Sequence, residues 1–543
     1  MLSTMQDVPL QMRRILQYGT SFHGRSRVAT ALAGGVSDAS YATVGANAAR
    51  LAHALRALGV REGDRVGTFM WNNQQHLEAY FAVPCMGAVV HPLNIRLAGD
   101  QVCYVANHAE DRVVIVDATL LPAFAPLLPA LKTVEHVVVN GAADGTALDA
   151  GQVAVHDYDS LVATFPDSFP WPDVEERSAA AMCYTSGTTG DPKGVVYSHR
   201  SIYLHALSAA LPDLFGLSAA DRILAIVPQF HVLAWGLPYS AFLTGASLAM
   251  PDRFLAAEPL AAFIAAARPN KAAGVPTVWQ SLLAYLDDHP EADVSSLREG
   301  IVGGSACPPS LMDAYQRRYG ITLLHAWGMT EMSPLGTLAR IPAGVPAEDA
   351  WHLRLTQGRF PATVQPRLVG PGGGVLPNDG YSTGELEVRG PWITGGYYGG
   401  ADPDRFHDGW LRTGDVGAIS PDGYLTLTDR AKDVIKSGGE WISSVELENH
   451  LMAHPAVAEA AVVGVPDERW GERPLATVVL RDGHECMTLG ELRVFLAGRV
   501  PRWQLPERWA VIPAVPKTSV GKFDKKVLRR QYADGQLPTE HVT

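Results

Sequence analysis

The chain has few cysteines and no excess of basic residues, and each shortage excludes a class of protein. Its 543 residues include five cysteines, an odd number without metal-binding spacing: Cys85, Cys103, Cys183, Cys307 and Cys486. Neither a disulfide framework nor a zinc site is indicated, and a reducing, cytoplasmic location is expected. The 44 Lys and Arg residues against 56 Asp and Glu give a net charge of −12. This balance argues against broad nucleic-acid binding, although it leaves room for a local basic site.

Long hydrophobic runs are also absent from the sequence. No stretch approaches the roughly 18 uncharged apolar residues of a transmembrane helix. Residues 1–20 carry Asp7, Arg13 and Arg14 and contain no apolar segment of signal-peptide length. Peripheral membrane contact stays open, because an apolar substrate could be collected from a bilayer. The 47% hydrophobic and 18% charged residues are typical of a globular enzyme, and the chain is too long for a single core.

Helical and strand patterns alternate over the first 400 or so residues. We expect helices at 46–58, 75–86 and 255–267, and strands at 65–71, 113–116 and 223–227. Strands that alternate with helices predict parallel sheets covered on both faces. The fold class is therefore expected to be α/β, with αβα layers in a large N-terminal domain.

The pattern changes beyond residue 380. Residues 384–390 and 423–428 alternate with period two, which predicts strands of a small β-rich subdomain. A compact α+β unit follows, with expected helices at 444–453 and 489–500 and an expected strand at 458–463. We expect an N-terminal domain of residues 1–431, β-rich from about 340, and a C-terminal domain of residues 432–543. The polar segment 429–433 has the composition of a hinge between them.

The most informative segment is the loop 184–194, Tyr-Thr-Ser-Gly-Thr-Thr-Gly-Asp-Pro-Lys-Gly. It follows an apolar strand pattern and precedes a helix-like segment. Hydroxyls, backbone N–H groups and one lysine together suit a polyphosphate, and glycines allow its close approach. A Walker A loop needs Ser or Thr directly after Gly-Lys, whereas Lys193 follows Pro192 and precedes Gly194. A surface turn rich in Gly and Thr is the alternative.

Five other segments carry chemically useful residues, although each has an ordinary structural explanation. His231 and Trp235 are four residues apart, so they share one face if 228–236 is helical. Residues 303–308, Gly-Gly-Ser-Ala-Cys-Pro, form a strand-end turn, and 325–331, His-Ala-Trp-Gly-Met-Thr-Glu, combine a ring, a hydroxyl and a carboxylate. Asp415 ends 410–415 with a carboxylate suited to ribose hydroxyls, and Lys522 lies in the basic run 516–526. Core aromatics, turn residues and a solvated tail explain each segment taken singly.

The order of these segments resembles that of the acyl-CoA synthetases (fatty-acid:CoA ligases) of the adenylate-forming superfamily. The resemblance covers nearly the whole chain and is strongest to medium-chain acyl-CoA ligases and methylmercaptopropionate-CoA ligases. It rests on 183–190, 230–236, 303–308, 325–331 and 436–443, of which 325–331 and 436–443 are highly specific. One departure is Gln229, where the family more often has Met. This position is expected beside the acyl group, away from the adenylation chemistry.

The resemblance implies a reaction in two steps. A carboxylic acid, expected to be a medium-chain fatty acid, attacks the α-phosphate of ATP, and the acyl-adenylate then reacts with CoA. The C-terminal domain is implied to rotate between the steps about a hinge at Lys432. The implied cofactor and co-substrates are Mg²⁺, ATP and CoA, and a homodimer without nucleic acid is expected.

The resemblance also implies roles for individual residues. Those expected to be catalytic are Lys522, Thr185, Glu331 and His231, with Thr185 and Glu331 as the metal ligands. The expected ATP-binding residues are Thr185, Ser186, Gly187, Thr188, Thr189, Gly190, Lys193, Gly304, Ser305, Ala306, His325, Ala326, Trp327, Gly328, Thr330, Asp415, Arg430, Lys432, Lys436, Trp441 and Lys522. The expected acyl-binding residues are His231, Val232, Trp235 and Gly304, and the expected CoA-binding residues are Ser437, Gly438, Gly439 and Glu440.

Three alternatives share parts of these motifs. An acyl-AMP ligase that loads a carrier protein would use the same first step. A non-catalytic nucleotide-binding relative would be expected to lack Lys522 or Glu331, and both are present. A luciferase-type oxygenase is disfavoured by the Trp-bearing segment 230–236, which resembles that of fatty-acid ligases.

Overall fold

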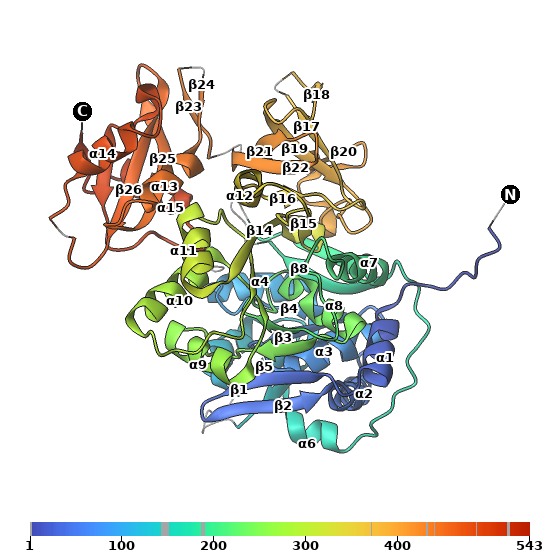
Figure 1. Cartoon of the computed structure of the whole chain (residues 1–543). Coiled ribbons are helices and arrows are strands. Elements are labelled where there is room, and N and C mark those ends of the chain that lie inside the picture. The colour runs from blue at the N-terminus through green and yellow to red at the C-terminus, as the bar shows by residue number, and fades with distance from the viewer. Residues whose placement is uncertain are drawn as a thin grey trace.

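The computed structural model describes residues 3–142, 151, 153–185, 191–370, 372–430, 433–438, 440–484, 486–518 and 522–542, with only the backbone at 440 and 441. Within these ranges the strands form three sheets. The C-terminal sheet, in orange and red, lies beside the antiparallel part of the chain and above the large N-terminal body (Figure 1). No helix of the described part has both the length and the apolar character needed to cross a bilayer.

The smaller N-terminal sheet carries the loop 184–194 at its edge. Its order is β7-β6-β5-β3-β4-β8-β9, and every pair is parallel except β8–β9. The strands are β3 (Arg65–Phe69), β4 (Val89–Pro92), β5 (Asp111–Asp117), β6 (His136–Asn140), β7 (Ala154–Asp157), β8 (Ala179–Tyr184) and β9 (Gly194–Ser198). A helix does follow the loop, as expected, but residues 194–198 first pair with β8 as strand β9. The helix begins at His199, where Ser198 and Ser201 form a capping box.

The larger sheet joins a parallel half to an antiparallel half. Its order is β18-β17-β19-β21-β22-β16-β15-β14-β13-β12-β10-β11-β1-β2, with β20 paired to β21. The parallel strands are β1 (Arg27–Leu32), β10 (Arg222–Ala225), β11 (Ser247–Met250), β12 (Lys271–Gly274), β13 (Glu299–Val302) and β14 (Thr322–Gly328). β2 (Gly35–Ser40) pairs antiparallel with β1. The expected parallel sheets are thus present, with antiparallel strands added at their edges.

The β-rich subdomain expected from about 340 starts slightly earlier, because β15 already pairs antiparallel with β14. Its strands are β15 (Leu335–Leu338), β16 (Gly358–Arg359), β17 (Gln365–Val369), β18 (Val375–Leu376), β19 (Gly384–Arg389), β20 (Phe406–His407), β21 (Trp410–Ile419) and β22 (Tyr424–Arg430). β14 therefore belongs to both halves. This shared strand fixes the β-rich part rigidly against the parallel sheet.

The helices of the N-terminal part follow the expected alternation with strands. They are α1 (Met12–Phe22), α2 (Tyr41–Ala57), α3 (Gln74–Cys85), α4 (Gly99–Ala109), α5 (Leu121–Phe124), α6 (Tyr158–Ala163), α7 (His199–Ala209), α8 (Leu237–Thr244), α9 (Ala257–Ala267), α10 (Pro276–Asp288), α11 (Pro309–Tyr319) and α12 (Ala347–Leu355). The helix expected at 46–58 starts five residues earlier, because Ser40 accepts a hydrogen bond from the Thr43 backbone N–H at 3.0 Å.

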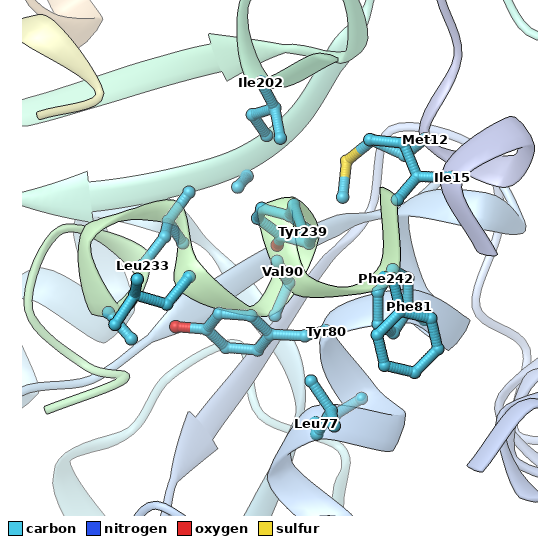
Figure 2. Packing of buried hydrophobic residues seen from close by; sticks show 14 of the residues in the cluster. Met12, Ile15, Leu77, Tyr80, Phe81, Val90, Ile202, Leu233, Tyr239 and Phe242 are labelled. Carbon is cyan, nitrogen blue, oxygen red and sulfur yellow. The ribbon is translucent and has the colours of Figure 1, made fainter. Parts of the chain in front are cut away.

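Aromatic packing anchors α8, which directly follows the segment 228–236. Figure 2 shows Tyr239 and Phe242 of α8 beside Tyr80 and Phe81 of α3. The ring centroids of Phe81 and Phe242 are 4.3 Å apart, and those of Tyr80 and Tyr239 are 5.9 Å apart. Each such aromatic pair stabilises the fold by about 0.5–1.5 kcal/mol more than the burial of its apolar surface alone. The start of α8 is therefore held firmly in the core.

The C-terminal residues form a separate sheet with its own buried cluster. Its strands are β23 (Ile435–Ser437), β24 (Glu440–Ile442), β25 (Val457–Asp467), β26 (Gly471–Leu480), β27 (Arg508–Val511) and β28 (Glu540–His541). Its helices are α13 (Ser444–Met452), α14 (Leu489–Ala497) and α15 (Lys525–Ala533). Ile442, Leu451 and Trp509 are each fully buried in its core. These elements agree in kind with the α+β unit expected from the sequence.

A buried ion pair ties α15 to α13. The Lys525 ammonium lies 2.7 Å from a Glu448 carboxylate oxygen, and the two side chains are 12% and 8% exposed. Lys525 also donates a hydrogen bond to Ser444 Oγ at 2.6 Å. The pair therefore satisfies two charges that would be costly to bury alone.

We predict that Lys525→Met destabilises the protein by about 3–5 kcal/mol, because Glu448 is left buried without its cation. Lys526→Met is the matched control, since the neighbouring Lys526 side chain is exposed, and it should change stability by less than about 0.5 kcal/mol. Denaturant unfolding followed by circular dichroism measures both. Equal effects of the two substitutions would contradict a structural role for the pair.

Candidate active site

Two joined cavities lie at the carboxyl ends of β13 and β14, where the antiparallel and C-terminal parts meet. The first encloses about 170 Å³ and the second about 730 Å³. Both are lined by Gly304, Ala326, Trp327, Gly328, Arg430 and Lys522, so they form one continuous site. Segments from 185 to 522 contribute to it, as the order of the sequence motifs predicts.

The first cavity has a charged end and an apolar end. Its charged and hydroxyl side chains are Thr185, Lys193, Thr330, Glu331, Asp402, Arg405, Thr413, Arg430 and Lys522. Its apolar wall is made by Phe215, Val232, Trp235, Pro334 and Leu335. Such a cavity suits a ligand that carries an anionic group on an apolar body.

The polyphosphate loop connects β8 to β9 as a hairpin. The Thr185 backbone N–H donates to the Lys193 carbonyl at 2.9 Å, and the Lys193 N–H donates to Thr185 Oγ1 at 3.2 Å. These bonds bring both ends of the loop to the first cavity. Residues 186–190 lie outside the described residues, so their expected phosphate contacts stay predictions.

Lys193 and Glu331 are each held by a neighbour from the segment 397–405. The Lys193 ammonium pairs with the Asp402 carboxylate and lies 5.4 Å from the centre of the Tyr397 ring. The Tyr397 hydroxyl donates to Glu331 Oε1 at 2.5 Å. Glu331 is 5% exposed, so its carboxylate reaches the cavity from a largely dry position. Both side chains predicted near the phosphates are therefore in one site.

Asp415 is held by two of the predicted adenosine-binding residues. Trp327 Nε1 donates to Asp415 Oδ2 at 2.8 Å, and Arg430 Nε lies 3.2 Å from Asp415 Oδ1. Asp415 and Arg430 are direct partners in the β21–β22 pairing. The Asp415 charge is the largest cause that raises the pKa of Arg430 above its usual value. The three side chains form a fixed group at the wall of the second cavity.

The turn after β13 brings the backbone close to the reactive part of the site. Gly304 has φ +88°, a left-handed conformation that L side chains rarely adopt. A Cβ on Gly304 would lie 3.6 Å from Lys522 Cε, and one on Gly303 would lie 3.3 Å from Trp235 Cη2. Ser305, Ala306 and His325 line the second cavity beside this turn. Burial lowers the pKa of His325 to about 4, so its ring is neutral at pH 7.

The segment 232–236 forms a left-handed turn. Val232, Leu233, Ala234 and Trp235 have φ of 47°, 55°, 50° and 57°. The condition for His231 and Trp235 to share the face of a right-handed helix is therefore not met, although both side chains line the first cavity. The Cys183 thiol lies beside the backbone N–H groups of Val232 and Leu233, which offset part of the rise that burial causes in its pKa. Nothing in the sequence signals the turn, because its first glycine is Gly236.

His231 is neutral in this site. Burial, together with the nearby charges of Lys522 and Arg96, lowers the pKa of His231 to about 3. An imidazole with this pKa cannot act as a general acid at neutral pH. It can accept or donate one hydrogen bond beside Lys522.

Ser437 and Gly438, two of the residues predicted for CoA, belong to the C-terminal part and line neither cavity. Lys436 is exposed, and its backbone N–H donates to Glu472 at 2.9 Å. Ser437 is buried and accepts from Arg473 Nη1 at 3.2 Å, while Gly438 faces the Trp470 ring. Glu440 and Trp441 belong to β24, of which only the backbone is described there. Lys432 and Gly439 lie outside the described residues.

Sequence reasoning assigned no role to eight side chains of the first cavity: Phe215, Met329, Pro334, Leu335, Thr413, Tyr397, Asp402 and Arg405. The last three come from the segment Gly-Gly-Tyr-Tyr-Gly-Gly-Ala-Asp-Pro-Asp-Arg, residues 395–405. Nothing in the sequence distinguishes that segment from an ordinary Gly-rich loop, and Phe215 resembles any core aromatic.

The match to protein families covers most of the chain. The family described as AMP-binding enzyme matches residues 22–398, and its AMP-binding enzyme C-terminal domain matches residues 446–522. Two curated relatives are similar over nearly their whole length. A 3-methylmercaptopropionyl-CoA ligase of Ruegeria pomeroyi is 44% identical over 98% of this chain and 99% of its own. A medium-chain-fatty-acid–CoA ligase of Ectopseudomonas oleovorans is 42% identical over 98% of both chains.

Solved structures share the fold throughout. An anthranilate-CoA ligase in complex with anthranoyl-AMP superposes with a TM-score of 0.87 at 25% identity, over 98% of this chain and 99% of that chain. ATP-bound MatB from Rhodopseudomonas palustris gives a TM-score of 0.82 at 25% identity, over 97% and 100%. The expected α/β fold and ligase class are thereby confirmed. The chain belongs to the AMP-binding enzyme family and is an ATP-dependent, AMP-forming acyl-CoA ligase that acts through an acyl-adenylate.

Proposed function

We propose that the enzyme activates a medium-chain carboxylic acid and transfers its acyl group to CoA. The observation that carries this proposal is the first cavity, whose apolar wall of Phe215, Val232, Trp235 and Leu335 opens onto cationic Lys193 and Lys522. The names of the relatives from Ruegeria and Ectopseudomonas add support. ATP and CoA are the co-substrates of this ligase class.

In the first step the acid's carboxylate attacks the α-phosphate, so two anions must be brought together. Lys522 reaches the junction of the two cavities, and we assign to it the stabilisation of negative charge there. Thr330 is placed at the α-phosphate, and Thr185, Lys193 and residues 186–190 at the departing pyrophosphate. His231, Val232, Trp235 and Gly304 border the acyl group. The substrate is already a carboxylate, so the step needs no general base.

The adenosine part is assigned to the second cavity. The adenine would lie between the turn Gly304, Ser305 and Ala306 and the segment 325–328, which contains the Trp327 ring. The Asp415 carboxylate would accept hydrogen bonds from both ribose hydroxyls, with Arg430 holding its other oxygen. The fixed Trp327–Asp415–Arg430 group supports this assignment, because its geometry is set before the nucleotide arrives.

The cavity fits Mg²⁺ through oxygen ligands. Glu331 supplies a carboxylate and Thr185 a hydroxyl at the same cavity, and this ion is usually held by one or two carboxylates plus phosphate oxygens. When bound there, Mg²⁺ supplies positive charge to the polyphosphate.

The second step requires a different position of the C-terminal domain. Lys522 lines both cavities, whereas Ser437 and Gly438 line neither. We propose that residues 432–543 rotate as one domain relative to residues 1–431, about a hinge at Lys432. Ser437, Gly438, Gly439 and Glu440 would then line the CoA channel, and Lys436 and Trp441 would meet the adenylate. A cytoplasmic homodimer is proposed from the family resemblance.

We expect AMP release to depend on CoA and to peak at medium-length acids. Release is measured with ATP and saturated acids of about four to about eighteen carbons, because pockets discriminate each methylene by about 1–3 kcal/mol. AMP release that does not depend on CoA would contradict the proposed function. The absence of AMP release with every acid tested would contradict it too. A peak at the longest acids would contradict only the assigned chain length.

We predict that Lys522→Ala lowers the rate of acyl-adenylate formation by about 10²–10³, because it removes a charge that stabilises the transition state. Capture of a supplied acyl-adenylate by CoA should stay near the wild-type rate, since Lys522 is assigned no part in it. Single-turnover assays of each half-reaction measure this difference, with Lys517→Ala as the control. Equal losses in both half-reactions would count against alternation of the domain.

We predict that Phe215→Ala moves the preferred acid to a longer chain. The side chain is 1% exposed at the apolar wall, and its removal adds room for at least one methylene. The ratio of kcat/KM for long over short acids should rise by about tenfold or more. Leu217→Ala is the control, because this buried neighbour does not line the cavity. An unchanged ratio in Phe215→Ala would exclude Phe215 from the acyl wall.

A further inference from the structure

We propose that Asp402 is a binding-site residue that competes with the polyphosphate for Lys193 and thereby speeds the exit of pyrophosphate. This inference rests on the proposed role of Lys193 at the β- and γ-phosphates. Both side chains line the first cavity, and their charged atoms form an ion pair. The ammonium is thus already neutralised by a carboxylate where an anionic substrate would bind.

The ion pair lies at the edge of the cavity and can be exchanged. The Lys193 and Asp402 side chains are 23% and 31% exposed, respectively. Water therefore reaches both partners, and separating them does not leave a charge in a dry interior. Asp402 has φ +48°, a left-handed conformation that Asp adopts more readily than most residues. The Asp402 carboxylate therefore projects from a turn of defined backbone conformation.

Neighbouring contacts hold this turn in place. Arg405 Nε and Nη2 each donate at 3.0 Å, to the carbonyls of Arg412 and Thr413, and the Arg405 N–H donates to the Asp402 carbonyl at 3.2 Å. At the other end of the segment, the Tyr397 hydroxyl donates to Glu331. The segment 397–405 is therefore anchored on both sides of the ion pair. These contacts hold Asp402 beside Lys193.

Electrostatics decide what this carboxylate does. A phosphate that binds Lys193 must displace Asp402, and the two anions then repel each other across a few ångströms. In a partly exposed site water screens this repulsion only in part. Asp402 therefore weakens the binding of ATP and of pyrophosphate alike. After the α–β phosphate bond breaks, the same competition favours departure of the pyrophosphate.

The weaker ground-state binding has a kinetic benefit. The adenylation step is reversible as long as pyrophosphate stays beside the acyl-adenylate. A residue that replaces it on Lys193 commits the adenylate to CoA, since the reverse attack loses its nucleophile. Asp402 forms no covalent bond in this scheme, and only ion pairs are exchanged.

The test is Asp402→Asn, which keeps the shape of the side chain and removes its charge. We expect calorimetric titration to show pyrophosphate binding about tenfold tighter than in the wild type. The KM for ATP should also fall, because ATP binds more tightly as well. Product inhibition by pyrophosphate should become about tenfold stronger. The calorimetric titration needs no turnover, so it stays informative even if the proposed acid specificity fails.

Asp404→Asn is the matched control. Asp404 belongs to the same turn, Pro403–Arg405, but it is exposed and does not line the cavity. It should leave pyrophosphate affinity within about twofold of the wild type. Equal tightening in both variants would overturn the proposal, because the effect would then be a general change of charge. Weaker pyrophosphate binding in Asp402→Asn would also overturn the proposal, because Asp402 would then help to bind the metal or the phosphates. Thermal unfolding checks that both variants are folded.

Discussion

The position of Lys522 depends on hydrogen bonds made by one carboxylate at the end of β22. Asp429 accepts from the backbone N–H of Ser444 at 2.8 Å and also from its hydroxyl, at the start of α13. Lys525 donates to that same hydroxyl and pairs with Glu448. The polar group thus connects the N-terminal sheet, α13 and α15 at one point. Lys522, three residues before Lys525, lines both cavities beside this connection.

Charge is arranged along the site in a consistent order. Lys193 and Arg405 lie at one end of the first cavity, and Lys522 and Arg430 lie where it joins the second. Each end also has a carboxylate that holds a cation in place, such as Asp415 beside Arg430. Neutralised cations of this kind stay well positioned before an anion arrives, and little reorganisation is then required during reaction. The apolar wall adds binding without adding charge.

The sequence predicted those parts of the molecule that depend on local pattern. Apolar periodicity located α2, α3 and α9, and the motifs brought Glu331, Asp415 and Lys522 into one site. Strand β9 was missed because its pairing with β8 outweighs the helical signal of the residues that follow. Phe215 and Asp402 were missed for a different reason, since only tertiary contacts distinguish them from an ordinary core ring and a turn carboxylate. The division at residue 431 and the site residues outside the described ranges stay predictions.

The left-handed turn at 232–235 links substrate preference to stability. A left-handed backbone costs about 1–2 kcal/mol per non-glycine residue. Glycine would relieve that strain, but it would also remove the buried side chains of Val232 and Trp235, and large-to-small changes in a core cost about 2–5 kcal/mol. The side chains of the acyl wall therefore also stabilise the turn that presents them. A substitution that widens the pocket here is expected to lower thermal tolerance at the same time.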